Sequence, residues 1–299
     1  MATYTSAPER ILQRLDFQVL RRLDGLLQGD YRTLFRGYGL DFADLREYQA
    51  EDDVRFIDWN VTARMDTPYV REYMEERELT AWFLLDLSPS VDFGTGDSDR
   101  LKRGVVIDFV STMARLLTRR GNRVGAVLYG ERVERTIPAG SGRNQVLRLI
   151  DDLLDQPRHA RAPFTDLTPL LEAGLRSIKR RSLVFVVSDF ISEPGWDRPL
   201  RLLSQRHEVL AIRVVDPRET ALPDVGPMIM EDAETGQQLY VDTHDRKFRR
   251  RFEEAALARE AALNAAFGRA GVQALTLSTD DDLIRAIVRM TVLRRRRRS

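Results

Sequence analysis

The stretch WFLLDLSPSVDFG, at residues 82–94, decides the fold. Its apolar beginning predicts a buried strand that ends at Asp86, and two hydroxyl residues, Ser88 and Ser90, follow at a spacing of two. Residues i, i+2 and i+4 of an extended backbone project to the same side, so these three side chains can converge at the carboxyl end of the strand. Ligands of open α/β sheets bind at that edge.

After residue 78, short apolar runs alternate with segments of helical periodicity. This alternation is typical of β-α units that stack into a mostly parallel sheet. The predicted fold class is therefore α/β, with a doubly wound, mostly parallel, Rossmann-type sheet. The expected strands are 80–85, 123–129, 132–137, 182–188, 208–215 and 272–277, and the expected helices are 101–119, 144–154, 167–178, 197–206, 244–269 and 280–291.

The sequence before this sheet predicts an amphipathic helix followed by a small β-containing lobe. The helix starts at the capping box SAPE, at residues 6–9, and stops at Gly29. Residues 31–78 are dense in charged and aromatic residues, which favours turns and short strands. We therefore divide the chain into an N-terminal region at 1–78, a sheet domain at 79–291 and an arginine-rich tail at 292–299, with an added hairpin within 223–242.

The composition excludes several classes of protein. Lys plus Arg number 47 against 46 Asp plus Glu, so there is no global attraction to nucleic acid or anionic lipid. The chain has no cysteine, which excludes disulfides and thiolate metal sites. It shows no leader segment and no apolar run of roughly 18 residues, so we expect a cytoplasmic protein without a membrane span.

Two further oxygen ligands are expected from neighbouring loops, namely Thr165 in PFTDL and Asp189 in LVFVVSDF. Small oxygen groups of this kind suit Mg²⁺ or Mn²⁺. Because most of the direct ligands would be neutral hydroxyls, the cation would keep much of its charge and an open position for a partner's carboxylate. The motif could also be only a strand end and turn, and Thr165 or Asp166 could simply cap the helix that begins near residue 167.

The pentapeptide DLSPS at residues 86–90, with a Thr and an Asp in later loops, resembles the metal ion-dependent adhesion site of von Willebrand factor A domains. The segment FRGYGLDFADLREYQAEDDVRFIDWNVTAR, at 35–64, resembles the N-terminal signature of the bacterial family called domain of unknown function fifty-eight. The resemblance covers residues 31–192 well. It implies a von Willebrand factor A-like sheet with Asp86, Ser88, Ser90, Thr165 and Asp189 as metal ligands.

Members of this family are commonly associated with MoxR-type AAA+ ATPases, which the resemblance implies as a partner. This chain departs from the family pattern in two places. Glu51 stands where the pattern tends to have Gly, and the Thr165 loop lacks the glycine pair often seen before that threonine. Thr168 is therefore a rival ligand.

The function expected from these features is that of a non-enzymatic, metal-dependent protein-binding adaptor that works with a MoxR-type ATPase on a client protein. The chain has no G-x-x-x-x-G-K-[ST] loop, so the ATPase must be another chain. The rival interpretation is a metal-dependent hydrolase or phosphatase with Asp86 as nucleophile. A third interpretation is that Arg294–Arg298 bind nucleic acid, although the same arginines could simply form a solvated tail.

Overall fold

The computed structural model describes residues 7–20, 22–23, 41–74, 78–92, 101–157, 165–231 and 236–298. The chain forms two compact units, of which the smaller comprises Gly29–Leu79 and the larger comprises Met1–Gln28 with Thr80–Ser299. The first helix, which our division grouped with the lobe, thus belongs with the sheet. The physical reason is its apolar face, because Leu12 and Leu15 are buried where α1 meets α5 and α6.

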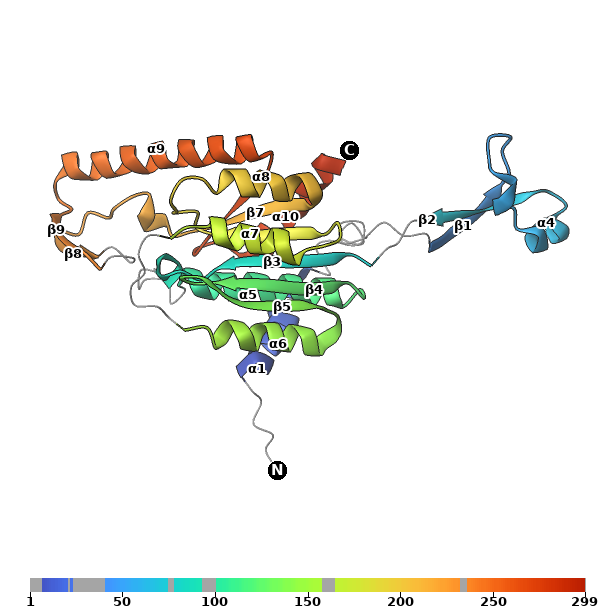
Figure 1. Cartoon of the computed structure of the whole chain (residues 1–299), viewed down its shortest axis with the longest axis horizontal. Coiled ribbons are helices and arrows are strands. Elements are labelled where there is room, and N and C mark those ends of the chain that lie inside the picture. The colour runs from blue at the N-terminus through green and yellow to red at the C-terminus, as the bar shows by residue number, and fades with distance from the viewer. Residues whose placement is uncertain are drawn as a thin grey trace, which may run out of the picture. The chain divides into compact units, whose positions relative to one another are not determined.

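A six-stranded sheet forms the centre of the larger unit, in the order β10-β7-β6-β3-β4-β5 (Figure 1). Every neighbouring pair is parallel except β4 and β5. The order reverses between β3 and β6, as in doubly wound sheets, which confirms the predicted fold class. The strands are β3 (Thr80–Asp86), β4 (Arg123–Tyr129), β5 (Val133–Gly140), β6 (Leu183–Ser188), β7 (Glu208–Val215) and β10 (Gln273–Ser278).

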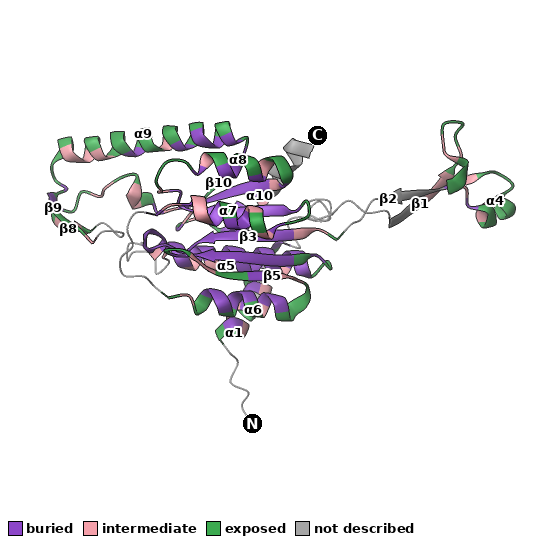
Figure 2. Ribbon diagram, viewed as in Figure 1, coloured by how far each residue is buried: buried purple, intermediate pink, exposed green. Residues whose placement is uncertain are grey.

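Helices cover both faces of the sheet, and the four central strands are almost entirely buried, whereas the edge strands β5 and β10 are largely exposed or half-buried (Figures 1 and 2). On one face, Trp82 and Leu84 pack with residues of α7, α8 and α9. On the other face, Phe83 stacks on Phe185 at 5.2 Å between ring centroids, and Phe109 of α5 meets Phe185 edge to face. The helices are α1 (Ala7–Leu15), continued by a π-helix at Asp16–Leu20, α5 (Lys102–Thr118), α6 (Gly142–Leu154), α7 (Thr168–Ser177), α8 (Asp197–Arg206), α9 (Arg246–Ala270) and α10 (Leu283–Arg298).

Two features outside the sheet were expected from the sequence, and one of them differs in the structure. The predicted hairpin is present as β8 (Pro227–Glu231) and β9 (Gln238–Asp242), although most of its turn lies outside the described residues. The predicted tail at 292–299 is not separate, because α10 continues through the arginines to Arg298. Arginine is a good helix former, so a run of arginines extends a helix that has already started.

The smaller unit contains a two-stranded antiparallel sheet of β1 (Asp41–Glu47) and β2 (Tyr69–Met74). Between these strands lie a 3₁₀ turn, Val54–Phe56, and one short helix, α4 (Trp59–Met65). The Asp58 carboxylate caps α4 by accepting hydrogen bonds from the amides of Asn60 and Val61. The strands and turns were expected, whereas the helix was not.

No helix within the described part of the chain is long and apolar enough to cross a bilayer.

Tight packing between α7 and β3 generates a first prediction. A Cβ added at Gly174 would lie 2.6 Å from Leu84 Cδ1, whereas one added at Gly268 of α9 would meet no atom within 4 Å. We expect Gly174→Ala to destabilise the fold by about 1–2 kcal/mol through overpacking. Gly268→Ala, the matched control, should stabilise it by about 0.5 kcal/mol through helix propensity. Thermal and urea unfolding would measure both, and equal effects would contradict the packing described.

Candidate functional site

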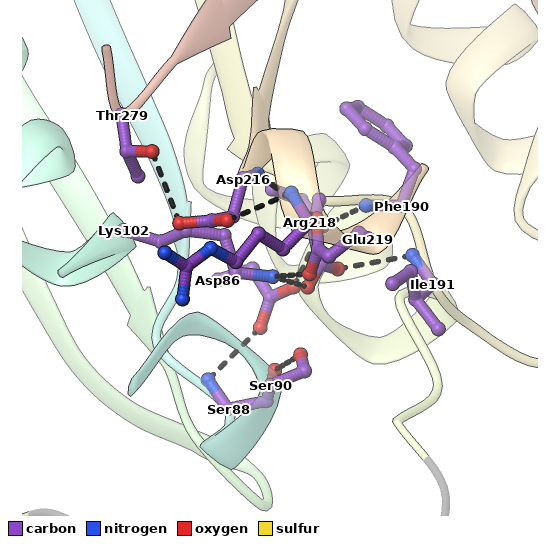
Figure 3. A network of polar contacts seen from close by, with 12 residues as sticks. Asp86, Ser88, Ser90, Lys102, Phe190, Ile191, Asp216, Arg218, Glu219 and Thr279 are labelled. Carbon is purple, nitrogen blue, oxygen red and sulfur yellow. Dashed lines mark hydrogen bonds and ion pairs between the residues drawn. The ribbon is translucent and has the colours of Figure 1, made fainter. Parts of the chain in front are cut away.

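The Asp86 side chain, at the end of β3, is completely buried. Its Oδ1 accepts a hydrogen bond from the Ser88 amide at 3.0 Å, and its Oδ2 accepts one from Ser188 Oγ at 2.6 Å (Figure 3). Ser188 is the last residue of β6, the neighbouring parallel strand. The Asp86 carboxylate therefore joins the carboxyl ends of the two strands between which the strand order reverses.

The turn after β3 brings the two predicted serine ligands together. Ser88 and Ser90 are buried, and their Oγ atoms lie 3.1 Å apart at the start of the 3₁₀ turn Pro89–Asp92 (Figure 3). Arg103 of α5 fixes this turn, because its guanidinium donates to both the Asp92 carboxylate and the Leu87 carbonyl. Three oxygen-bearing side chains thus gather at one strand end, but a turn brings Ser88 and Ser90 together, whereas the prediction assumed an extended backbone.

Asp189 follows β6 and is paired with a buried lysine. Asp189 Oδ2 accepts a hydrogen bond from Lys102 Nζ at 2.8 Å, and its Oδ1 accepts one from the Ile191 amide at 3.0 Å. Lys102, the first residue of α5, has a fully buried side chain and also donates to Glu219 Oε1 at 2.5 Å (Figure 3). The sequence analysis did not identify Lys102, Glu219 or Ser188 as part of the site.

The network continues to two further parallel strands, β7 and β10. Glu219 belongs to the short 3₁₀ turn Pro217–Glu219 after β7, where it forms a capping box with Asp216. Asp216 Oδ2 accepts a hydrogen bond from Thr279 Oγ1, directly after β10, at 3.1 Å (Figure 3). Polar side chains therefore connect the carboxyl ends of β3, β6, β7 and β10.

Burial and charge shift the proton affinities of the network. Burial raises the pKa of Asp86 to about 6, repulsion from Asp189 adds to the increase, and hydrogen bonds from Ser188 and Ser88 oppose it. Burial alone lowers the pKa of Lys102, but attraction to Asp189 and Glu219 outweighs burial and leaves that pKa above its ordinary value. Lys102 is therefore a charged ammonium, whereas Asp86 is a carboxylate whose charge is poorly compensated.

Thr165 lies in the loop before α7, next to the segment that follows β6. It is buried, and its backbone carbonyl accepts a hydrogen bond from the Glu193 amide at 2.9 Å. Neither of the two residues considered as a helix cap is the N-cap of α7, which is Leu167, although the Asp166 carboxylate accepts a hydrogen bond from the amide of Thr168 at 2.8 Å. The ligand role of the Thr165 hydroxyl, and of the rival Thr168, stays a prediction.

The donor set fits a hard divalent cation. No three carboxylate or imidazole groups gather in a metal-binding arrangement within the described ranges, so a cation here would depend on hydroxyls as well as carboxylates. Ser88, Ser90 and Asp86 supply such oxygens at one point, and buried oxygen donors of this type match Mg²⁺ and Mn²⁺. Each Asp189 oxygen accepts one of these hydrogen bonds and keeps a second lone pair that a cation could use.

The raised pKa of Asp86 generates a second prediction. The folded protein holds this proton up to about pH 6, whereas the unfolded chain releases it near its ordinary value of 3.8. The metal-free protein should therefore lose stability as the pH rises from about 4 to about 6. Asp86→Asn removes this penalty, so it should be more stable than the wild type at pH 7 by about 3 kcal/mol and equally stable below pH 4.

Urea unfolding in EDTA across this pH range would measure the effect, with the exposed Asp151→Asn as control. A pH-independent difference between Asp86→Asn and the wild type would rule out a buried, protonatable Asp86.

Comparison with known proteins places the chain in a family. The uncharacterized proteins Mb1516 of Mycobacterium bovis and Rv1480 of Mycobacterium tuberculosis are each 37% identical to it over 287 residues, which is 95% of this chain and 89% of theirs. Among solved structures, it is similar to BatB of Bacteroides thetaiotaomicron (13% identity, TM-score 0.47) and to an aerotolerance-related membrane protein of Bacteroides fragilis (12%, 0.48). Each alignment covers 73% of this chain and 99% of the other. The family model described as "Protein of unknown function DUF58" matches residues 44–262, and the chain belongs to this family.

Proposed function

We propose that this protein is a metal-dependent adaptor that binds other proteins in the cytoplasm through one Mg²⁺ or Mn²⁺ ion. The ion would be held by Asp86, Ser88, Ser90, Thr165 and Asp189. One observation carries the proposal, namely the buried convergence of the Asp86 carboxylate with the hydroxyls of Ser88 and Ser90 at the strand end. The reversal of strand order at this edge supports it, because ligands of such sheets bind there.

The charge balance of the network favours a cation. Four carboxylates, those of Asp86, Asp189, Asp216 and Glu219, belong to the network, to which Lys102 brings an ammonium group and Arg218 brings its backbone amide, a donor to Asp216 (Figure 3). Lys102 bonds directly to Asp189 and Glu219, whereas the hydrogen bonds that Asp86 accepts come from neutral donors. A divalent cation would supply the missing positive charge.

Each residue of the proposed cation site would have its own role. Asp86 would contribute the ionic attraction, and the hydroxyls of Ser88 and Ser90 would orient around the ion without neutralising it. Lys102 keeps Asp189 in place by an ion pair that neither residue exposes to water. A cation held mainly by neutral oxygens supplies a Lewis-acidic position that attracts a carboxylate of another protein.

Protein binding also fits the smaller unit, which exposes large apolar side chains around α4. Val54, Phe56, Trp59 and Met65 are all exposed there, and Trp59 is 69% exposed. Exposed aromatic and aliphatic groups of this kind mark interaction surfaces. The family resemblance supplies the partner class, a MoxR-type AAA+ ATPase acting on a client protein. The rival role of Asp86 as a nucleophile is less well supported, because position 88 carries a hydroxyl where many aspartyl phosphotransferases have a second carboxylate.

The proposed cation site is tested by removing one hydroxyl. We expect Ser88→Ala to weaken Mg²⁺ or Mn²⁺ binding at least tenfold in titration calorimetry, because one ligand is lost and the fold is kept. Ser111→Ala is the matched control, since the Ser111 hydroxyl is buried in α5 without a hydrogen-bond partner among the described residues. Equal affinity in the two variants would reject the ligand assignment.

The proposed partner is tested by complex formation. We expect a MoxR-type ATPase to crosslink to this chain in the presence of Mg²⁺ and ATP, and the complex to decrease with EDTA or with Asp86→Ala. Absence of any complex would contradict the partner. A complex that forms equally well with Asp86→Ala would contradict the metal dependence.

A further inference from the structure

The β8–β9 hairpin exposes large apolar side chains. Ile229, Leu239 and Tyr240 are 61%, 61% and 71% exposed, and Ile229 faces Tyr240 across the strand register. The hairpin is a separate two-stranded sheet, so each strand has one edge without a neighbouring strand among the described residues. Unpaired edges beside apolar side chains are places where a further strand can be added.

The base of this hairpin is fixed to the start of α9. Thr243 is completely buried, and its amide and hydroxyl both donate to the Gly226 carbonyl, at 2.9 and 2.8 Å. The Val225 amide donates to Thr243 Oγ1 at 3.0 Å, and Arg249 forms an ion pair with Asp224 at 3.1 Å. These contacts tie the base of the hairpin to the first turn of α9, into which the chain runs directly from β9 (Figure 1).

The start of α9 is strongly basic, with the sequence RKFRRR at residues 246–251. At 100° per residue, Arg246, Lys247, Arg250 and Arg251 lie within one arc of the helix, and all four are exposed. Arg246 with Arg250, and Lys247 with Arg251, are like-charge pairs at i and i+4, which destabilise a helix. Basic side chains in the first turns also oppose the helix dipole.

Little in the described part of the chain compensates this charge. Arg250 pairs with Glu254 at 3.5 Å, but no ion pair to a described residue is made by Arg246, Lys247 or Arg251. The nearby carboxylates are shared, because Asp245 caps α9, and Asp224 binds His244 and Arg249 while also attracting Arg246. We call Arg246, Lys247, Arg250 and Arg251 the basic arc, and these four residues can therefore attract negative charge on another molecule.

We infer that these residues form a docking surface for an acidic, extended segment of a partner protein. The segment would pair with an edge of the hairpin, place apolar side chains on Ile229 and Tyr240, and place carboxylates against the basic arc. A nucleic acid bound to the basic arc would leave Ile229 and Tyr240 without an apolar partner. Glu231, hydrogen-bonded to Gln238 at the far end of the hairpin, would repel an anionic bilayer and also a carboxylate placed there, so the carboxylates of the segment would have to lie at the base, toward the basic arc.

This surface does not require the proposed cation, since it includes none of the residues of the strand-end network. Its test uses the full chain and a fluorescent probe peptide that alternates glutamate with valine. A peptide that alternates lysine with valine, an oligonucleotide and phosphatidylglycerol vesicles serve as competing ligands. The test variants are Tyr240→Ser and the double charge reversal Lys247→Glu/Arg251→Glu. Leu257→Ser and Arg259→Glu, both exposed further along α9, are the matched controls.

We expect the acidic peptide to bind in fluorescence anisotropy, with EDTA making no difference. The charge reversal should weaken its binding on the order of tenfold, Tyr240→Ser should weaken it several-fold, and the controls should leave it unchanged. Equal binding by the wild type and the charge reversal would overturn the proposal, as would stronger binding of the oligonucleotide or the vesicles. Binding that is lost in EDTA would also overturn it and would assign the peptide to the strand-end network instead.

Discussion

The carboxylate of Asp86 is the constraint on which the site depends. It is buried at the end of a strand in the middle of the sheet, where ionising it is costly. The Ser88 amide and the Ser188 hydroxyl reduce that cost but carry no charge. Because Asp189 also repels it, Asp86 has a pKa near 6. Either a proton or a cation could neutralise the charge of this buried carboxylate.

The rest of the larger unit explains why this arrangement is held so firmly. The residues before Asp86 and Ser188 are apolar and buried on both faces of the sheet, so neither strand can slip without exposing its core side chains. Gly174 allows α7 to approach Leu84 closely, and Arg103 fixes the turn that carries Ser88 and Ser90. The polar groups therefore sit on a firmly packed base.

The sequence predicts the elements whose signals are local. The apolar run before Asp86 predicts β3, and the spacing of two predicts that Ser88 lies with Ser90 at its end. Lys102 could not be found in this way, because it meets Asp189 across 87 residues of sequence and only the packing of α5 against the sheet brings them together. Ser188 was closer to recognition, since it directly precedes Asp189 after the same apolar strand.

The misassigned elements also have physical explanations. The short helix α4 depends on the Asp58 cap and on the left-handed backbone of Asp66. Neither signal stands out in a segment that is dense in charged and aromatic residues. The arginines after residue 293 resemble a disordered tail by composition alone, yet they continue α10 because nothing in that run breaks a helix. Helix capping explains α4 and helix propensity explains the end of α10, whereas composition alone suggested that neither segment is helical.

The two proposed surfaces make the same chemical demand on a partner. A cation at Asp86 with an open position would attract a carboxylate, and the basic arc at the start of α9 would attract carboxylates as well. The hairpin that adjoins this arc follows β7 through the turn containing Glu219, which itself belongs to the strand-end network. An acidic segment would therefore suit both regions, and a partner that reaches both would bind more tightly than one that reaches either alone. Selectivity for acidic partners would then arise from two separate features of the fold, of which only one depends on metal.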